Sequence, residues 1–331
     1  MQRTEQKRRP APQTADGRFL EAALELAERG VGKTSPNPPV GAVVAIGGKI
    51  AGRGWHRRAG GDHAETAAIK DAIRRGIRDF SKATLYATLE PCSRPGRVGA
   101  CTDAIASAGI GRVVYAATDP NPVNRGRARR VLAAKGIDCR LFKGGPEISA
   151  RAKLLVRHFA KLATTGLPWV TVKIAMSLDG RICDASGNAK WISSEKARRT
   201  TGKLRETADA VMVGAGTVRA DDPSLLSHGR PNPRLVRVVI SKSGRLPRNA
   251  QVFNDGRNRT LVFADPLEAL RALGKAGAMH VVCEGGLKLA ASLAKQGLVD
   301  EWIAVLAPKV IGDGPLNRAA TVGNVECLQD W

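Results

Sequence analysis

Aromatic side chains are scarce in this chain, at 4% of 331 residues, although Lys and Arg outnumber Asp and Glu by 53 to 30. The resulting formal net charge of +23 favours phosphate-bearing partners. Proteins that bind single-stranded nucleic acids stack the bases on aromatic rings, and few rings are available here. We therefore interpret the charge as a basic surface suited to anionic small molecules, and not as a dedicated nucleic-acid face.

The chain also lacks long apolar runs. No stretch is long enough to cross a bilayer as a helix, and the first residues do not have the pattern of a secretory signal. The cysteines are few and scattered, at positions 92, 101, 139, 183, 283 and 327. This spacing does not indicate a disulfide framework, and it favours a location in the reducing cytoplasm.

The length and the order of the expected elements predict two α/β domains joined by a connecting helix. Residues 1–17 are polar, basic and contain proline, which predicts a disordered arm. We expect the first domain over residues 18–150, the connecting helix or linker over 151–167, and the second domain over 168–331. The second domain shows no repeat relation to the first.

Apolar periodicity and turn residues place the elements within these domains. In the first domain we expect helices at 18–30, 63–75, 101–108 and 127–135. Strands are expected there at 40–46, 49–55, 83–89, 113–117 and 139–142. A helix at 147–162 leads into the second domain, where we expect helices at 194–206, 267–276 and 288–296. Strands are expected there at 169–175, 210–213, 236–241, 259–264, 280–283 and 301–307.

A possible zinc site stands out in the first domain. His63-Ala64-Glu65, Pro91-Cys92 and Cys101 follow the order found in zinc deaminases, in which the glutamate carries protons and does not bind metal. Zinc held by three protein ligands keeps a fourth position for water. The pattern predicts His63, Cys92 and Cys101 as ligands and Glu65 as the catalytic residue. We expect Cys92 to begin a helix, where its thiol ionises readily.

Other interpretations of these residues exist. A lone histidine is usually a surface residue, and a structural zinc finger needs a fourth ligand, which does not stand at finger spacing. Eight residues separate the two cysteines, whereas nucleic-acid deaminases typically carry Pro-Cys-x-x-Cys. The longer insert contains Arg94 and Arg97, which are either phosphate-binding residues or ordinary solvent-exposed cations.

The second domain carries two glycine turns after expected strands. Gly214-Ala215-Gly216 precedes Thr217, a possible helix N-cap, and Gly285-Gly286 follows the strand at 280–283. The first turn lacks the third glycine of a dinucleotide fingerprint. A ligand at the sheet edge and ordinary tight connections therefore remain alternatives. Lys173 lies inside an expected strand, and its burial there favours a functional role.

Several motifs together resemble the bifunctional deaminase–reductase family of riboflavin biosynthesis. In the first half they are Ser35-Pro36-Asn37-Pro38, Gly52-Arg53-Gly54-Trp55-His56, His63-Ala64-Glu65, Thr88-Leu89-Glu90-Pro91-Cys92-Ser93 and Asp119-Pro120-Asn121-Pro122. In the second half they are the segments 173–181, 191–192, 213–218, 220–223 and 284–286. The resemblance extends from about residue 18 to near the end of the chain.

The resemblance implies a cytidine-deaminase-like α/β/α sandwich followed by a dihydrofolate-reductase-like α/β domain. The first would bind Zn²⁺ and deaminate a diaminopyrimidinone that bears a ribosylamino phosphate. The second would use NADPH to reduce the ribosyl group to ribityl. Family members tend to associate through the reductase half, which implies a homo-oligomer.

The resemblance also implies further site residues. Contacts with the deaminase substrate would come from Asn37, His56 and Asn121. The cofactor would be bound by Ala175, Trp191, Thr217, Asp221, Gly285 and Gly286. The reductase substrate would contact Lys173, Arg205, Leu225 and Glu284.

The chain departs from the family pattern at several of these places. Arg94 stands where the family usually has histidine after the Glu-Pro-Cys-Ser string. In the second half, Ala189 replaces a serine, His228 an arginine and Ser241 an aspartate, and the chain ends early at Trp331. Because these changes cluster at ligand positions of one half, they lead to the hypothesis of a competent deaminase with a weakened reductase.

Three functions therefore compete. The first is a bifunctional enzyme of riboflavin biosynthesis. The second is a pyrimidine deaminase paralogue whose second domain is impaired or serves as a scaffold. The third, suggested by the net charge, is a nucleic-acid deaminase or RNA-binding protein. The long spacing between the cysteines and the presence of a whole second domain argue against the third.

Overall fold

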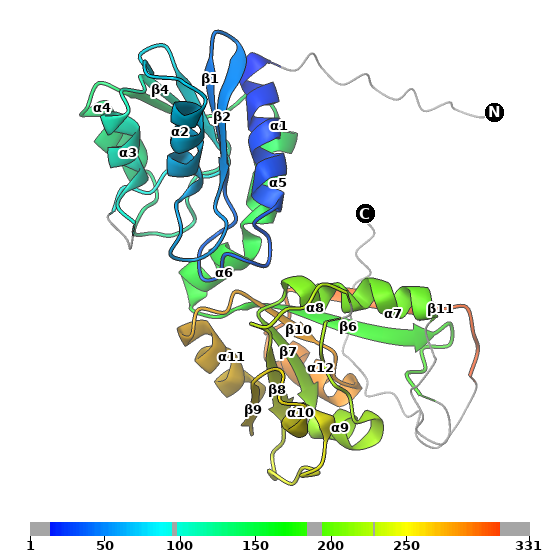
Figure 1. Cartoon of the computed structure of the whole chain (residues 1–331). Helices are drawn as coiled ribbons and strands as arrows, with labels where there is room; N and C mark the ends of the chain where they lie inside the picture. The colour runs from blue at the N-terminus through cyan, green and yellow to red at the C-terminus, as the bar shows by residue number, and fades with distance from the viewer. Residues whose placement is uncertain (1–13, 95–97, 184–193, 228, 312–331) are drawn as a thin grey trace, which may run out of the picture. The chain divides into compact units, whose positions relative to one another are not determined.

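The computed structural model describes residues 14–94, 98–183, 194–227 and 229–311 (Figure 1). The chain divides into two compact units, Met1–Thr164 and Thr165–Trp331, so the division falls inside the expected connector. Each unit has a β-sheet and apolar cores of its own. In the described part of the chain, no helix combines the length and apolarity needed to span a bilayer.

The sheet of the first unit has five strands in the order β2-β1-β3-β4-β5. The strands are β1 (Gly41–Ile46), β2 (Lys49–Trp55), β3 (Thr84–Ala87), β4 (Arg112–Tyr115) and β5 (Asp138–Leu141). β1 pairs antiparallel with β2 and β3, whereas β3, β4 and β5 run parallel. Because β3 and β4 are parallel neighbours, the loops that follow them lie side by side.

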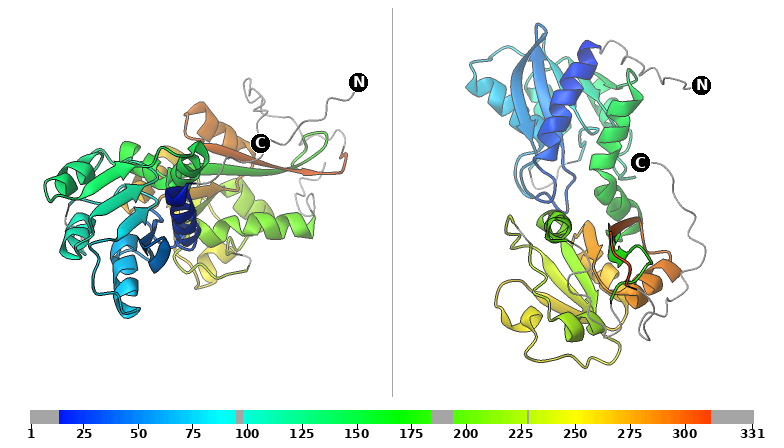
Figure 2. Two further views of the ribbon diagram at one scale, coloured as in Figure 1. Left: turned by 90° about the horizontal axis from the view of Figure 1, so that it is seen from above. Right: turned by 90° about the vertical axis from the view of Figure 1, so that its right-hand side faces the viewer.

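Helices cover both faces of this sheet (Figures 1 and 2). α1 (Ala15–Glu28) and α5 (Pro146–Leu155) pack together on one face, and α6 (Arg157–Thr165) follows α5. The other face carries α2 (Ala64–Arg74), α3 (Cys101–Ser107) and α4 (Arg127–Ala133). α2 packs so closely against β2 that a Cβ atom on Gly54 would stand 2.3 Å from the Ala64 carbonyl oxygen. The absence of a side chain at Gly54 therefore allows the N-terminus of α2 to approach β2 this closely.

The second unit has a six-stranded sheet in the order β11-β6-β10-β7-β8-β9, with every pair parallel. The strands are β6 (Trp169–Ser177), β7 (Ala210–Gly214), β8 (Val236–Ile240), β9 (Thr260–Phe263), β10 (His280–Cys283) and β11 (Glu301–Ala307). The side chains of alternate residues in β7 pack into cores on opposite faces of the sheet. Met212 faces one core, and Val211 and Val213 face the other.

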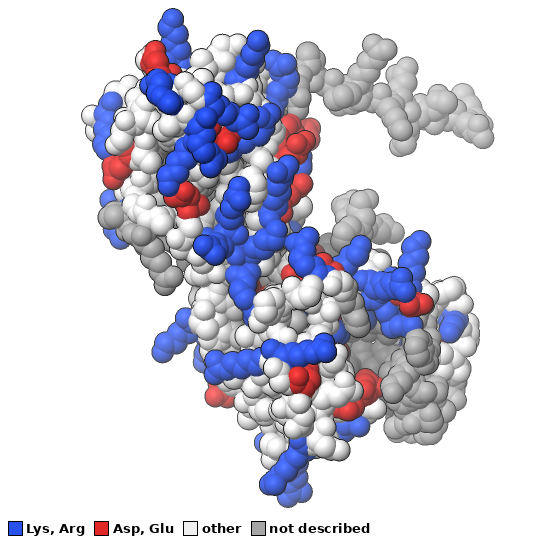
Figure 3. All heavy atoms as spheres, viewed as in Figure 1, with Lys and Arg blue, Asp and Glu red and all other residues white. Residues whose placement is uncertain are grey.

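Two groups of helices complete the second unit. α11 (Pro266–Lys275) and α12 (Leu287–Lys295) cover the core that contains Met212. The opposite core is closed by α8 (Leu204–Thr207), α9 (Ala215–Asp221) and α10 (Gln251–Asn254), and α7 (Glu195–Gly202) precedes α8. Basic side chains are spread over the visible face of each unit, in agreement with the net charge (Figure 3).

Several expected boundaries are wrong. α1 begins at Ala15 and not at residue 18, because the Thr14 hydroxyl accepts a hydrogen bond from Gly17 N at 3.2 Å and caps the helix. Residues 15–17 of the expected arm therefore belong to α1. The expected helix over 147–162 is divided at Val156 into α5 and α6, and that over 194–206 into α7 and α8. The short helix α10 was not expected, and α9 was indicated only by the possible N-cap at Thr217.

Candidate active sites

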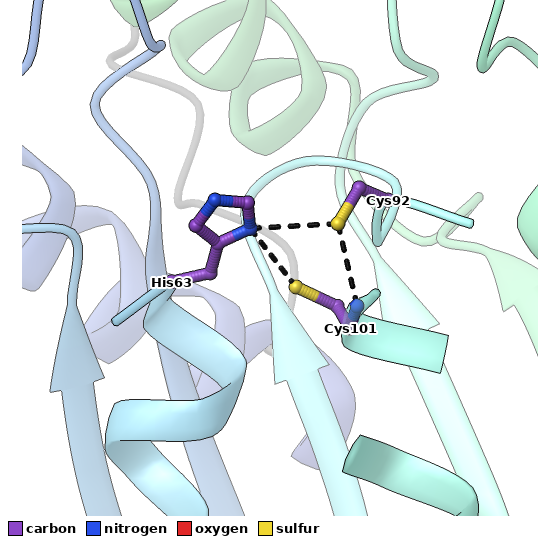
Figure 4. Close-up of side chains that lie close together, drawn as sticks. All are labelled: His63, Cys92 and Cys101. Atoms are coloured by element: carbon purple, nitrogen blue, oxygen red, sulfur yellow. Dashed lines mark hydrogen bonds between the residues drawn. The ribbon is translucent and has the colours of Figure 1, made fainter. Parts of the chain in front are cut away.

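Three potential metal ligands meet in the first unit (Figure 4). His63 Nδ1 lies 3.4 Å from Cys92 Sγ and 3.2 Å from Cys101 Sγ. The three ligand atoms all lie within 4.8 Å of one another. One imidazole nitrogen and two sulfurs are a donor set that suits zinc, so these residues fit the ion that the sequence order indicates.

The elements that carry these residues differ in part from expectation. His63 is the N-cap residue of α2 and Cys101 is the first residue of α3. Cys92 lies in the loop after β3, so the expectation that it begins a helix is wrong. Its sulfur nevertheless accepts a hydrogen bond from the Cys101 N–H at 3.3 Å, which places it at the N-terminus of α3 in space.

The protonation of this cluster is uneven. Hydrogen bonds from Cys101 and His63 lower the pKa of Cys92 to about 4. The same contact with Cys92, together with burial, raises the pKa of Cys101 well above its usual value. The hydrogen bond to Cys92 also raises the pKa of His63. Cys92 is therefore the thiol of the pair that ionises first.

Glu65 lies in the first turn of α2 and is only 3% exposed. Burial raises the pKa of its carboxyl group, and the nearby Cys92 thiolate raises it further. A carboxyl group with a raised pKa can both accept and donate a proton during turnover. The structure thus brings a candidate proton carrier next to the candidate metal ligands.

His56 uses both of its ring nitrogens within the protein. Nδ1 lies 2.9 Å from the Asp62 carbonyl oxygen, and Nε2 lies 3.1 Å from Asn37 Nδ2. Because a carbonyl oxygen only accepts, Nδ1 carries the proton and Nε2 accepts from the Asn37 amide. Burial lowers the pKa of His56, which favours this neutral form. The arrangement turns the Asn37 side-chain oxygen away from His56, and the His56 ring packs edge-on against His63 with centroids 5.3 Å apart.

The remaining residues expected in this site lie in two loops. Asn121 follows β4 and is half-buried; its N–H donates to Asp119 Oδ1 at 2.8 Å, and its Oδ1 accepts from Val123 N at 3.1 Å. Arg94 is exposed in the loop after β3. Arg97 lies outside the described residues.

A charged cluster lies at the carboxyl ends of the strands in the second unit. Arg205 Nε and Nη2 donate to the two Glu284 oxygens at 2.5 and 2.9 Å, and Nη1 donates to the Leu226 carbonyl oxygen at 2.9 Å. Lys173, on β6, is half-buried, and burial lowers the pKa of its ammonium group. Glu284 counteracts this effect on Lys173, so the three charged groups form one electrostatic cluster.

The two glycine turns of the second unit are in contact. β7 and β10 are parallel neighbours, and a Cβ atom on Gly285 would lie 3.3 Å from Gly214 N. α9 starts directly after β7, with Gly214 as its N-cap residue, so Thr217 lies inside the helix and its expected N-cap role is wrong. Both turns lie at the carboxyl edge of a parallel sheet, where ligands of α/β proteins bind.

The other expected reductase residues are spread over several elements or lie outside the described part of the chain. Ala175 is half-buried on β6, Asp221 is the last residue of α9, and Leu225 is 2% exposed with a positive φ of 55°. Gly286 is exposed and caps α12. Trp191 lies outside the described residues, as do Ala189 and His228.

Comparison with known proteins gives the same division of the chain. The profile of the cytidine and deoxycytidylate deaminase zinc-binding region matches residues 13–117, and that of the RibD C-terminal domain matches residues 168–323. The riboflavin biosynthesis protein RibD of Aquifex aeolicus is 36% identical over 323 residues, covering 90% of this chain and 88% of that protein. This chain belongs to the RibD family.

Further relatives agree with this assignment. RibD of Mycobacterium tuberculosis is 39% identical over 307 residues, covering 91% of this chain and 87% of that protein. A crystal structure from Thermotoga maritima, described as a diaminohydroxyphosphoribosylaminopyrimidine deaminase/5-amino-6-(5-phosphoribosylamino)uracil reductase, is 33% identical with a TM-score of 0.81. It covers 91% of this chain and 88% of its own.

Membership of the RibD family confirms the fold that the sequence predicts, a deaminase-like domain followed by a reductase domain. Zinc belongs to the deaminase domain and NADPH to the reductase domain. The comparisons support the bifunctional interpretation, and not a paralogue with an impaired second domain or a nucleic-acid deaminase.

Sequence reasoning missed the residues that join the two loops of the RibD deaminase domain. Glu90, Asp119 and Asn124 are all buried and hydrogen-bonded between the loop after β3 and the loop after β4. Glu90 directly precedes Pro91-Cys92, which was the available signal. Asn124 carried none, because its partners in the loop after β3, Ser93 and Pro91, lie 31 and 33 positions away along the chain.

Proposed function

We propose that the chain catalyses two consecutive steps of riboflavin biosynthesis. The first is the hydrolytic deamination of a diaminopyrimidinone that bears a ribosylamino phosphate. The second is the NADPH-dependent reduction of the ribosyl group to ribityl. The observation that carries the proposal is the meeting of His63, Cys92 and Cys101 beside the buried Glu65 in a chain of the RibD family.

His63 Nδ1 and the sulfurs of Cys92 and Cys101 would hold the zinc ion. The ion supplies Lewis-acid activation of water when it is bound. The metal-ligating cluster found among the described residues contains these three side chains and no fourth, which is the ligand number of a catalytic site. A structural zinc finger would need four.

Glu65 would carry protons during deamination. Its raised pKa suits a group that takes the two protons of the attacking water in turn and passes one to the ring nitrogen and the other to the leaving amine. Water adds to the ring carbon, the bond from that carbon to the exocyclic nitrogen breaks, and ammonia leaves. The ring then carries a carbonyl group in place of the amine.

The substrate would be oriented by residues on the loops around the cluster. The Asn37 side-chain oxygen, directed by the hydrogen bond to His56, would accept from the pyrimidine, and Asn121 would contact the ring or the ribose. Because both His56 ring nitrogens are occupied by protein groups, His56 would act through Asn37. Arg94 and Arg97 would bind the phosphate.

In the reductase domain, positioning would do most of the chemical work, because hydride transfer requires the nicotinamide and the sugar carbon to be in contact. Lys173, Arg205, Leu225 and Glu284 would form the substrate side. Ala175, Trp191, Thr217, Asp221 and the turn at Gly285-Gly286 would form the cofactor side. NADPH is oxidised to NADP⁺ as hydride and a proton are added to the ribosyl group.

We further propose a cytoplasmic homo-oligomer that associates through the reductase domain. Trp302 and Leu306 support the association, because they are 39% and 62% exposed on β11, at the edge of the described sheet. Cys92, Cys101, Cys139, Cys183 and Cys283 form no disulfide, which supports a reducing compartment.

The proposed function is tested by following both products with the purified chain. We expect ammonia release from the diaminopyrimidinone without NADPH, and NADPH oxidation only after deamination has occurred. Full turnover of NADPH with the deaminated substrate would also refute the hypothesis of a weakened reductase. Absence of ammonia release, combined with RNA binding that falls steeply with salt, would overturn the proposal in favour of the nucleic-acid alternative.

A further inference from the structure

Asn124 connects the two loops of the deaminase domain that carry proposed functional residues. Cys92 lies in the loop after β3, and Asn121 lies in the loop after β4. Asn124 is 7% exposed, so its amide needs protein partners. The sequence position of Asn124 indicates no role in metal or substrate binding, since Asn124 is next to neither Cys92 nor Asn121 along the chain.

The Asn124 side chain makes its hydrogen bonds to both loops. Its Oδ1 accepts from Ser93 N at 2.8 Å and from Ser93 Oγ at 2.9 Å. Its Nδ2 donates to Asp119 Oδ2 at 2.8 Å and to the Pro91 carbonyl oxygen at 3.5 Å. Cys92 thus lies between two residues whose main chains are bound by the same amide.

These bonds constrain Cys92 directly. The Ser93 N–H belongs to the peptide group that follows Cys92, and the Pro91 carbonyl belongs to the one that precedes it. Fixing both peptide planes restricts the backbone dihedral angles of Cys92, and with them the direction of its Cα–Cβ bond. The position of the Cys92 thiol relative to His63 and Cys101 therefore depends on the Asn124 side chain, although Asn124 forms no hydrogen bond with the side chains of these three residues in the contacts described above.

The same amide reaches the substrate side of the site. Asp119 accepts from Asn124 through Oδ2 and from the Asn121 N–H through Oδ1, at 2.8 Å each. Glu90 provides a second connection, since its carboxylate accepts from Asp119 N, Gly126 N and Ala128 N at 3.2, 3.0 and 3.1 Å. Glu90 anchors the loop after β4 and the start of α4, whereas Asn124 binds both peptide groups around Cys92. The Thr102 N–H also donates to the Cys92 carbonyl oxygen, but it binds only the second of these two groups.

We propose that Asn124 is a positioning residue that orients Cys92 for zinc and holds Asn121 in register with it through Asp119. This inference rests on the proposed function. Partners in the outer shell of a metal site typically change metal affinity or activity by about 10–100-fold when they are removed. Loss of the Asn124 amide should therefore weaken zinc binding and substrate binding together.

The test compares zinc affinity in Asn124→Ala and in the unaltered chain by competition with a chelator. We expect the affinity to fall by about tenfold or more in the variant. Asn232→Ala is the matched control, because Asn232 is also buried and bridges main-chain groups, Arg205 O at 2.9 Å and Ala208 O at 2.8 Å, but lies in the second unit. We expect its zinc affinity to be unchanged.

Two further measurements separate positioning from a purely structural role. The midpoint temperature of unfolding should rise less on zinc addition in Asn124→Ala than in the unaltered chain. A purely structural role of Asn124 would instead lower the midpoints of the zinc-free and zinc-bound forms equally. With zinc in excess, kcat for deamination should recover while KM stays raised, because excess metal fills the site but does not restore the Asn121 loop.

The outcomes are distinct. If the unaltered chain binds no zinc, the proposed function fails first. If it binds zinc and a folded Asn124→Ala variant binds it equally tightly, this inference is overturned and the proposed function stands. If Asn124→Ala does not fold, Asn124→Asp decides, because its side chain has nearly the same size and still accepts from Ser93, but its carboxylate cannot donate to the Pro91 carbonyl oxygen or to Asp119. We expect Asn124→Asp to weaken zinc binding several-fold, and unchanged affinity would refute the inference.

Discussion

His56 donates through Nδ1 to the Asp62 carbonyl oxygen and accepts through Nε2 from the Asn37 amide, 3.1 Å away. The imidazole thus fixes which end of the Asn37 amide faces a ligand. His56→Phe would keep an aromatic ring against His63 but remove both hydrogen bonds. We expect zinc content to be unchanged and KM for deamination to rise about tenfold, the value of one or two lost hydrogen bonds.

A double variant checks that His56 acts through Asn37. If it does, Asn37→Ala combined with His56→Phe should raise KM no more than Asn37→Ala alone. Additive effects would show instead that His56 contacts the substrate independently.

The Arg205–Glu284 pair predicts a selective loss in the reductase domain. Arg205 donates to both Glu284 oxygens and to the Leu226 carbonyl oxygen, and lysine cannot reproduce this planar arrangement of donors. We expect Arg205→Lys to reduce NADPH oxidation at least about tenfold and to leave ammonia release unchanged. Arg199→Lys is the control, because Arg199 forms an exposed pair with Glu195 on α7, and both rates should stay the same.

The Asp16–Arg112 pair predicts a pH-dependent contribution to stability. Burial acts to raise the pKa of Asp16, but hydrogen bonds from Arg112 and Tyr86 outweigh it and hold the pKa below the ordinary value of 3.8. A carboxylate with a lowered pKa stabilises the folded state above the unfolded-state value, and the contribution disappears as pH falls through the folded-state pKa.

Asp16→Asn should therefore lower the free energy of unfolding at neutral pH by about 1 kcal/mol, and the difference should vanish in acid below the ordinary aspartate pKa. Denaturant unfolding over a pH series measures it. Asp103→Asn is the control, because the Asp103–Lys135 pair is exposed and should contribute little. A difference that persists unchanged into acid would contradict the assignment to Asp16.

Close packing at Gly54 predicts that the first site is sensitive to a single methyl group. A Cβ atom there would lie 2.3 Å from both Ala64 O and Ala68 N, so α2 would have to move away from β2. Since α2 carries His63 and Glu65 at its start, Gly54→Ala should lower stability by about 1–3 kcal/mol and reduce zinc content. Gly111→Ala, with its nearest contact at 3.6 Å, should change neither quantity.

The sequence predicts the first site better than the loops that support it. The order of His63, Glu65, Cys92 and Cys101 reflects a chemical requirement that is independent of exact geometry, so its ligand types could be inferred without a structure. The helix position of Cys92 was wrong, because a spacing shows how many residues intervene but not where the helix begins. The contact with the N-terminus of α3 arises through space, from the Cys101 N–H to the Cys92 sulfur.

Contacts between loops, and short helices, were harder to predict. Asn124 and the paired turns at Gly214 and Gly285 obtain their roles from the adjacency of parallel strands, which follows from the sheet order and not from local sequence. The short helix α10 has four residues, too few to show an apolar period. The long strands and amphipathic helices of both units carried such a period and were placed within a few residues.

Ammonia release by Glu65→Gln, with zinc content determined on the same sample, tests the central claim most directly. The substitution keeps the size of the side chain but removes its ability to carry a proton. We expect one zinc per chain, as in the unaltered protein, and a fall in deamination of about 100-fold or more. Deamination at the unaltered rate by zinc-loaded Glu65→Gln, or by the unaltered chain after its zinc has been removed, would contradict the account.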